Sequence, residues 1–247
     1  MAKQPTRRSN SSDPRIRDLR RSLRAAGNAE HARFHKGYHK SSLSFHGLKT
    51  PAMRAAARAA FPRRDKLERK ELLELVTELW TFEWFEERFC ALELLSRAAP
   101  ELGARDLPLI KRLTTHCDGW VLLDHLACNT LSPLALNLGE PIYDKVCTWS
   151  RHRHMWTRRA SILVHIRPAR ASELALDRAF ETFEERLFEE EFFIRKAIGW
   201  TLRECSRHYP KQVHEFLVRV GDAASGLTRR EGARNLPAAL RRAVLGK

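Results

Sequence analysis

The chain has 247 residues, of which 43% are hydrophobic, so it is long enough for one or two domains with a real apolar core. Its 45 Lys and Arg residues outnumber its 30 Asp and Glu residues, and the net charge is +15. This excess attracts polyanions, so nucleic acid is the leading partner class, ahead of an acidic protein or anionic lipid. Because no uninterrupted apolar run reaches about 18 residues and no apolar segment follows the basic start, we expect a cytoplasmic protein with no membrane role.

The first part of the chain, residues 1–14, is polar and basic and has no periodic apolar face, which predicts a disordered arm. We expect one folded domain over residues 15–247. There, apolar residues recur at helical spacing, and strand-type alternation is nearly absent. The clearest blocks are residues 67–79, 85–95, 107–113, 121–131, 156–166 and 192–202.

Proline and glycine residues separate these blocks, which predicts a train of short helices with tight connections. Paired helices that recur about every 35 to 45 residues match the hairpin units of HEAT-like repeats. The predicted fold class is therefore all-α, a curved HEAT-like solenoid rather than a compact helical bundle. The concave surface of such a superhelix can follow a duplex backbone.

Five cysteines occur singly along the chain, with no CxxC pair and no His/Cys ligand spacing. This pattern predicts buried free thiols in a reducing compartment and no metal site. They are Cys90, Cys117, Cys128, Cys147 and Cys205.

Basic residues cluster between Asp144 and Glu173, where the sequence has no acidic residue. A solvated helix face explains such a run about half of the time, but interleaved tryptophans favour a binding surface. The following segment, residues 181–191, is rich in glutamate, would repel phosphate, and is placed on the outer, convex side. The basic and aromatic residues of the patch are Lys145, Trp149, Arg151, Arg153, Trp156, Arg158, Arg159, Arg167 and Arg170.

Two helical spacings place an aromatic ring beside a charge. Trp120 and Asp124 are four residues apart, so their side chains share one helix face, with Asp118 as the predicted N-cap. Trp156 and Arg159 are three apart on a later helix. An indole face stabilises a cation by about 0.5 to 2 kcal/mol. A carboxylate in a partly dry site stabilises developing positive charge more strongly than it does in water.

An alkylated purine nucleotide is a cation of this kind, and its base is already a good leaving group. Breaking its glycosidic bond requires a carboxylate to stabilise the oxocarbenium-like sugar, aromatic walls, and an arginine for the flanking phosphate. Taken singly, however, a tryptophan on a helix is more often a core residue than a pocket residue, by about three to one. The spacings alone leave both interpretations open.

Three motifs resemble the AlkD-type alkylpurine DNA glycosylases, a bacterial family of HEAT-like repeat proteins. Residues 192–204, FFIRKAIGWTLRE, are similar to the family signature FFIxKAIGWxLRE. Residues 156–163, WTRRASIL, resemble the WLxRxAIL helix, and residues 120–124, WVLLD, resemble the WxxxD pair. The resemblance implies that Trp120, Asp124 and Arg159 are the catalytic residues.

Weaker similarity extends the resemblance to about residues 32–233. Residues 47–54, GLKTPAMR, are similar to the GIxTPxxR segment, and residues 227–231, LTRRE, also match. Counting back from Thr50 places Tyr38 at a substrate-facing tyrosine, and Lys49 takes a DNA-proximal polar position. The substrate- and DNA-binding residues implied are Trp200, Trp156, Tyr38, Arg158, Lys49, Arg203, Arg229 and Arg230.

The chain departs from the family pattern at two positions. Gly119 stands where members often carry a second tryptophan before the aspartate, which either removes an aromatic wall or eases the start of the helix. Lys49 replaces the usual polar residue. Both departures bear on substrate range.

The family implies hydrolytic removal of cationic alkylpurines, such as 3-methyladenine, 7-methylguanine or bulkier adducts, from duplex DNA without base flipping. It implies a monomer that needs no metal or organic cofactor. The first alternative is a non-catalytic protein that binds distorted or branched DNA, and Asp124 argues against it because relatives without this aspartate are of that kind. The second alternative is a HEAT-like protein scaffold, which the positive charge disfavours.

Overall fold

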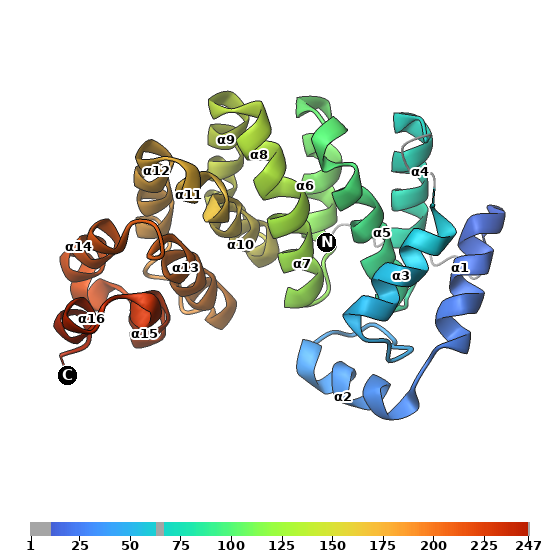
Figure 1. Ribbon diagram of the computed structural model, residues 1–247, viewed down its shortest axis with the longest axis horizontal. Coiled ribbons are helices and arrows are strands. Elements are labelled where there is room, and N and C mark those ends of the chain that lie inside the picture. Colours follow the sequence, from blue (N-terminus) through green and yellow to red (C-terminus); the bar gives the residue numbers. More distant parts are fainter. Residues whose placement is uncertain (1–10, 63–66, 247) are drawn as a thin grey trace. The chain divides into compact units, whose positions relative to one another are not determined.

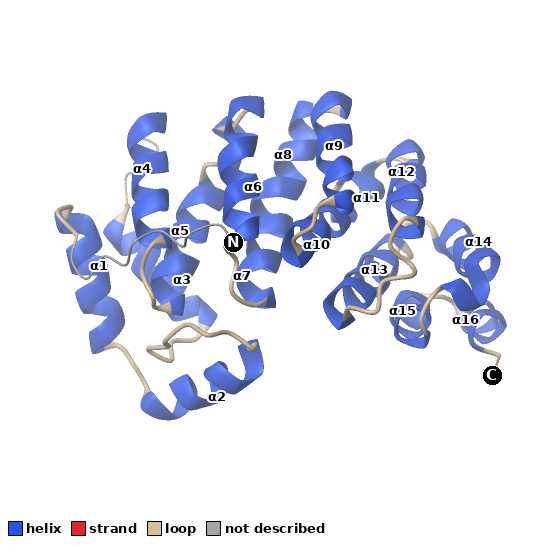
Figure 2. Cartoon of the chain, turned by 180° about the vertical axis from the view of Figure 1, so that it is seen from behind, coloured by secondary structure: helices blue, strands red, loops and turns tan. Residues whose placement is uncertain are grey.

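A computed structural model describes residues 11–62 and 67–246 of the chain. Within these ranges the regular structure is helical (Figure 2). The β-type pairing there is confined to a single parallel bridge between Ser44 and Trp84. The predicted all-α class is therefore confirmed. Among the described helices, none has both the length and the apolar character needed to cross a membrane.

The chain forms two compact units, whose helices are labelled in Figure 1. Unit 1 comprises Met1–Leu102 and Pro108–Leu126, and unit 2 comprises Gly103–Leu107 and Ala127–Lys247. The expected curvature of the solenoid and the single domain over residues 15–247 stay predictions.

Unit 1 contains helices whose apolar faces pack on one another in succession. Helix α1 packs on α3, α3 and α4 pack on α5, and α5 packs on α7. The predicted blocks at residues 67–79 and 85–95 correspond to α4 and α5. The helices are α1 (Pro14–Ala25), α2 (Ala29–His39), α3 (Thr50–Ala60), α4 (Arg69–Trp80), α5 (Phe85–Arg97), α6 (Leu107–Thr115) and α7 (Trp120–Leu126).

The first helix has a well-formed N-terminus. The Asp13 carboxylate accepts hydrogen bonds from the backbone N–H groups of Arg15 (2.8 Å) and Ile16 (3.4 Å), which satisfies donors that have no partner inside the helix. Pro14 occupies the first helical position, where its missing N–H has no cost. Ser11, which lies within the predicted arm of residues 1–14, is buried. Residues 1–10 of that arm lie outside the described residues.

The larger segment of unit 2 begins with a π-helical stretch, Ala127–Leu131, and continues with the helices α8 to α16. Helix α13 packs against α10 and α15, α11 packs on α12, and α14 packs on α16. The predicted blocks at residues 156–166 and 192–202 correspond to α10 and α13. The helices are α8 (Ser132–Leu138), α9 (Glu140–Cys147), α10 (Met155–Leu163), α11 (Pro168–Ala171), α12 (Glu173–Glu184), α13 (Phe192–Cys205), α14 (Pro210–Val220), α15 (Gly226–Gly232) and α16 (Ala238–Leu245).

A glycine in the signature segment permits the close packing of α13 on α15. A Cβ atom at Gly199 would lie 2.6 Å from the Cβ of Glu231 and 3.0 Å from the carbonyl oxygen of Thr228. No larger residue fits there without moving α15. The glycine of the IGW motif is thus explained by helix packing.

All five cysteines are free thiols. Cys90, Cys117 and Cys205 are buried as predicted, whereas Cys128 and Cys147 are partly exposed. Burial of Cys117, Cys147 and Cys205 raises the pKa of each thiol, so these sulfurs are protonated near neutral pH.

Candidate functional site

The predicted site residues of unit 1 meet where the C-terminus of α2 contacts the N-terminus of α7. Trp120 and Asp124 lie one turn apart on α7, and both are half-buried. The ring of Tyr38, on α2, stands edge-on to Trp120, with centroids 5.5 Å apart and planes at 73°. The tertiary structure therefore brings the predicted tyrosine to the predicted tryptophan.

Buried rings and hydrogen bonds hold this junction in place. The His39 ring is buried against Phe85, with centroids 4.7 Å apart, and against Phe45 at 5.2 Å. Asp118, the predicted N-cap of α7, accepts hydrogen bonds from the backbone N–H of Ser42 at 3.1 and 3.0 Å and also from its hydroxyl. The loop after α2 is thus fastened to the start of α7.

Backbone geometry explains the family departure at Gly119. This residue has a φ of +98°, and a Cβ atom there would lie 2.9 Å from the carbonyl oxygen of His39. Residues with a side chain rarely adopt such a conformation. Of the two interpretations of this glycine, the structure favours the one in which it shapes the start of the helix.

A buried carboxylate that the sequence analysis missed positions Lys49. Glu86, on α5, accepts backbone hydrogen bonds from His46 (3.0 Å), Gly47 (2.8 Å) and Leu48 (3.3 Å). Lys49 follows at once as the N-cap residue of α3 and is exposed. The sequence carries no clear signal for this role, because Glu86 stands beside Glu87 and Arg88 in a charged first turn of α5 that is typical of an exposed helix start.

The same carboxylate belongs to a buried group of possible metal ligands. Donor atoms of His46, Glu86 and Glu87 lie within 4.8 Å of one another. The Glu86 oxygens already accept backbone N–H groups, and the Glu87 carboxylate lies 3.4 Å from the guanidinium of Arg20. The His46 ring stacks on Trp84 at 3.9 Å. We therefore assign this group a structural role.

In unit 2, the predicted residues of α10 gather against α13. Arg159 is only 2% exposed and donates a hydrogen bond to the carbonyl oxygen of Phe193. The Phe193 ring lies 5.9 Å from the Arg159 guanidinium and 5.1 Å from the Trp156 ring. Trp200, further along α13, is half-buried. The predicted sharing of one helix face by Trp156 and Arg159 is thus confirmed.

The sequence interpretation that separated the acidic segment from the basic patch is wrong. Arg158 forms an ion pair with Glu189 at 2.8 Å and donates to the carbonyls of His152 and Arg153 at 3.0 Å. Residues some 30 positions apart meet because consecutive segments of the chain pack side by side. Opposite charges on neighbouring segments therefore neutralise one another. Arg151 pairs with Glu185 and Arg170 with Glu204 in the same way.

The other predicted phosphate ligands differ in their surroundings. Arg203 is paired with Glu231, and Arg229 is paired with Asp222 at 2.7 Å. Arg230 is exposed on α15. Trp149, which the sequence analysis counted among the aromatic residues of the patch, is 3% exposed and belongs to the core.

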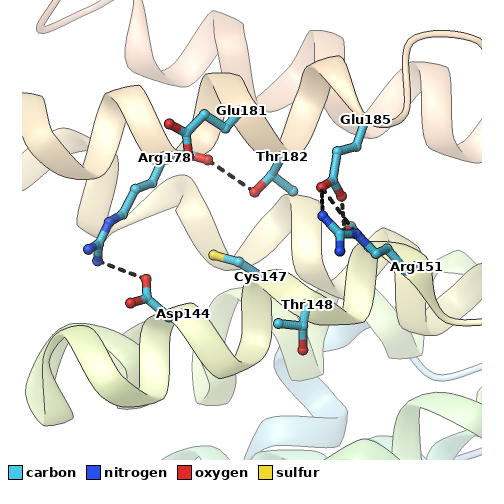
Figure 3. A pocket seen from close by; sticks show the side chains of 9 residues that line it. Asp144, Cys147, Thr148, Arg151, Arg178, Glu181, Thr182 and Glu185 are labelled. Carbon is cyan, nitrogen blue, oxygen red and sulfur yellow. Dashed lines mark hydrogen bonds and ion pairs between the residues drawn. The ribbon is translucent and has the colours of Figure 1, made fainter.

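A polar cavity of about 340 Å³ lies between α9 and α12 in unit 2 (Figure 3). Its charged walls are satisfied internally, since Arg178 pairs with Asp144 at 2.8 Å and Arg151 pairs with Glu185. Burial raises the pKa of Cys147, on its wall, to about 11. Arg151 of the predicted basic patch lines this cavity, but none of the predicted catalytic or DNA-binding residues does.

Together these features define an all-helical protein with an aromatic–carboxylate pair on one helix and a buried arginine near a phenylalanine ring on another. A family model described as DNA alkylation repair enzyme matches residues 19–236, so the chain belongs to this family. No match was found among curated proteins.

Two solved structures share the fold. The first is described as a predicted DNA alkylation repair enzyme from Enterococcus faecalis, with 22% identity, a TM-score of 0.78, and coverage of 86% of this chain and 97% of that chain. The second is the protein smu.31 from Streptococcus mutans UA159, with 14% identity, a TM-score of 0.60, and coverage of 87% and 100% respectively. At these identities the comparison establishes the fold, which agrees with the predicted HEAT-like class.

Proposed function

We propose that this member of the DNA alkylation repair family is a monofunctional glycosylase that hydrolyses the N-glycosidic bond of cationic alkylated purines in duplex DNA. The observation that carries the proposal is the arrangement at α7, where Asp124 and Trp120 share a half-buried face and Tyr38 stands against the indole. This arrangement supplies a carboxylate beside aromatic surface, which a developing sugar cation requires.

In the proposed mechanism, the alkylated base leaves as a neutral purine because it carries a positive charge before the bond breaks. Asp124 stabilises the oxocarbenium-like deoxyribose and orients the attacking water, which bonds to the anomeric carbon and releases one proton to solvent. Trp120 and Tyr38 pack against the sugar, and the base stays stacked in the duplex. Arg159 is proposed to attract a DNA phosphate through its charge rather than by direct contact, because its side chain is only 2% exposed, and burial weakens the screening of that charge by salt.

The proposed substrate is duplex DNA that contains 3-methyladenine, 7-methylguanine or a bulkier adduct. Trp156, Trp200, Lys49 and Arg230 are proposed to contact the DNA, and we expect a cytoplasmic monomer. Arg158, Arg203 and Arg229 would have to exchange or share their carboxylate partners to reach phosphate.

The test measures release of free 3-methyladenine and 7-methylguanine from methylated duplex DNA without divalent metal. We expect release by the wild type and a loss of about 100-fold or more for Asp124→Asn, with DNA binding retained. Asp177→Asn, an exposed aspartate on α12, is the matched control and should keep full activity. Equal release by wild type and Asp124→Asn would remove this carboxylate from the mechanism.

The net charge of +15 favours a second candidate function, a non-catalytic protein that binds distorted or branched DNA. No release of either base by the wild type, together with tight binding to branched duplexes, would support it. A protein scaffold, in contrast, predicts binding that does not weaken steeply with salt.

A further inference from the structure

Helix α2 presents two exposed aromatic rings that continue outward from the candidate site. Phe34 is 65% exposed and Tyr38 is 57% exposed, and their rings stack with centroids 5.7 Å apart and planes at 12°. Tyr38 in turn contacts Trp120. The three rings form one continuous row, and its outer member, Phe34, has no role in the proposed mechanism.

The residue that follows the last residue of α2 has a left-handed backbone conformation. Lys40 has a φ of +53° and is, among residues 11–62 and 67–246, the only residue other than glycine with a positive φ. Glycine is the usual residue at this position after a helix, because a Cβ atom destabilises the left-handed conformation. Non-glycine residues in this conformation persist where the surrounding structure holds them in it, and they cluster at active sites and ligand-binding sites.

The charge around the aromatic row is complementary to a polyanion. Arg33, Lys40 and Lys49 are exposed on α2 and on the loop that follows it, and Glu30 is the only acidic residue of α2. Lys36 holds the loop itself, since its ammonium group donates to the carbonyls of Ser42 (2.7 Å) and Leu43 (2.6 Å). Apolar rings flanked by cations match the sugar edges and phosphates of DNA rather than an acidic or purely apolar partner surface.

We propose that Phe34, Tyr38 and Lys40, the α2 ridge, form a DNA contact surface beyond the lesion, in which Phe34 packs on the deoxyribose or base edge of a flanking nucleotide and Lys40 binds its phosphate. The inference rests on the proposed function for its placement, because the row starts at Trp120. Phe34 and Lys40 act in binding and positioning and do not touch the reacting bond.

The experiment measures the affinity of the full-length protein for duplex DNA that carries a tetrahydrofuran abasic-site analogue, by fluorescence anisotropy across a salt series. Phe34→Ala should weaken binding about fivefold or more, since an aromatic contact to a nucleotide is lost. Phe188→Ala is the matched control. Phe188 is 79% exposed but lies in unit 2 beside Glu189, so its loss should leave affinity unchanged.

Lys40→Gly provides a readout that damage to the fold does not mimic. Glycine relieves the positive φ, so the melting temperature should rise, while the slope of log K against log salt should fall in magnitude by about 0.9 as one phosphate contact is lost. Lys211→Ala, at an exposed lysine on α14, should leave the slope unchanged.

Unchanged affinity for Phe34→Ala together with an unchanged salt slope for Lys40→Gly would overturn the α2 ridge, whatever the wild type does to methylated DNA. So would a Phe34→Ala variant that converts a dimer to a monomer in gel filtration with DNA binding intact, because the ring would then serve a second copy of the chain. Weaker binding by both variants would support the ridge even if the wild type released no base.

Discussion

Replacing Glu86 by glutamine tests how the buried carboxylate of α5 organises the loop before α3. The carboxylate accepts three backbone N–H groups at 2.8 to 3.3 Å. In Glu86→Gln, one amide oxygen can still accept from Gly47 and Leu48, but the amide NH₂ then faces the N–H of His46. One buried donor is left without an acceptor, which costs about 1 to 3 kcal/mol, and two charge-assisted bonds become neutral.

Removing the charge also removes the cost of burying a carboxylate, which offsets part of this loss of stability. We therefore expect Glu86→Gln to lower the free energy of unfolding by about 2 to 4 kcal/mol. With an m-value of about 2 kcal/mol/M, the urea midpoint would fall by about 1 to 2 M. Glu74→Gln is the control, because Glu74 is an exposed residue of α4 whose contact with Lys70 is 4.0 Å long, and it should change stability by less than about 0.5 kcal/mol. If both variants unfold at the same urea concentration, the role assigned to Glu86 is incorrect.

Two further predictions concern the junction of α2 and α7. Gly119→Ala should destabilise the protein by about 2 to 3 kcal/mol, because its Cβ meets the His39 carbonyl at a φ of +98°, whereas Gly103→Ala, with open space around it, should be neutral in the same urea titration. Burial, with a smaller contribution from His35, lowers the pKa of His39 to about 4. The unfolded chain therefore binds more protons between pH 6.5 and 4, and the stabilisation present above pH 6.5 is lost as the pH falls, by at most about 3 kcal/mol. His39→Phe should flatten this part of the stability profile, and superimposable profiles of the two proteins between pH 7 and 4.5 would contradict the assignment.

The basic patch shows why charge along a sequence is a poor guide to charge on a surface. Arg151 and Arg158 lie in a segment without acidic residues, yet each is paired with a glutamate from residues 181–191. The predicted binding surface is therefore smaller than its sequence suggests. The exposed cations Lys40, Lys49 and Arg230 are better candidates for phosphate contacts.

The sequence by itself determined the helical blocks, the pairing of Trp120 with Asp124 on one helix face, and the pairing of Trp156 with Arg159. These features depend on contacts within one or two helical turns, and the spacing of residues along the chain sets such contacts. The signature around Gly199 also indicated the family, because helix packing as well as the proposed site constrains the residues of this segment.

Only the tertiary structure decided which distant residues meet. The contact of Tyr38 with Trp120, the anchoring of the loop before Lys49 by Glu86, and the left-handed conformation of Gly119 all depend on how α2, α5 and α7 pack. Helical periodicity shows which face of a helix is buried but not what is buried against it. Partner choice is fixed by the topology of the whole unit, and a single sequence carries no local signal for it.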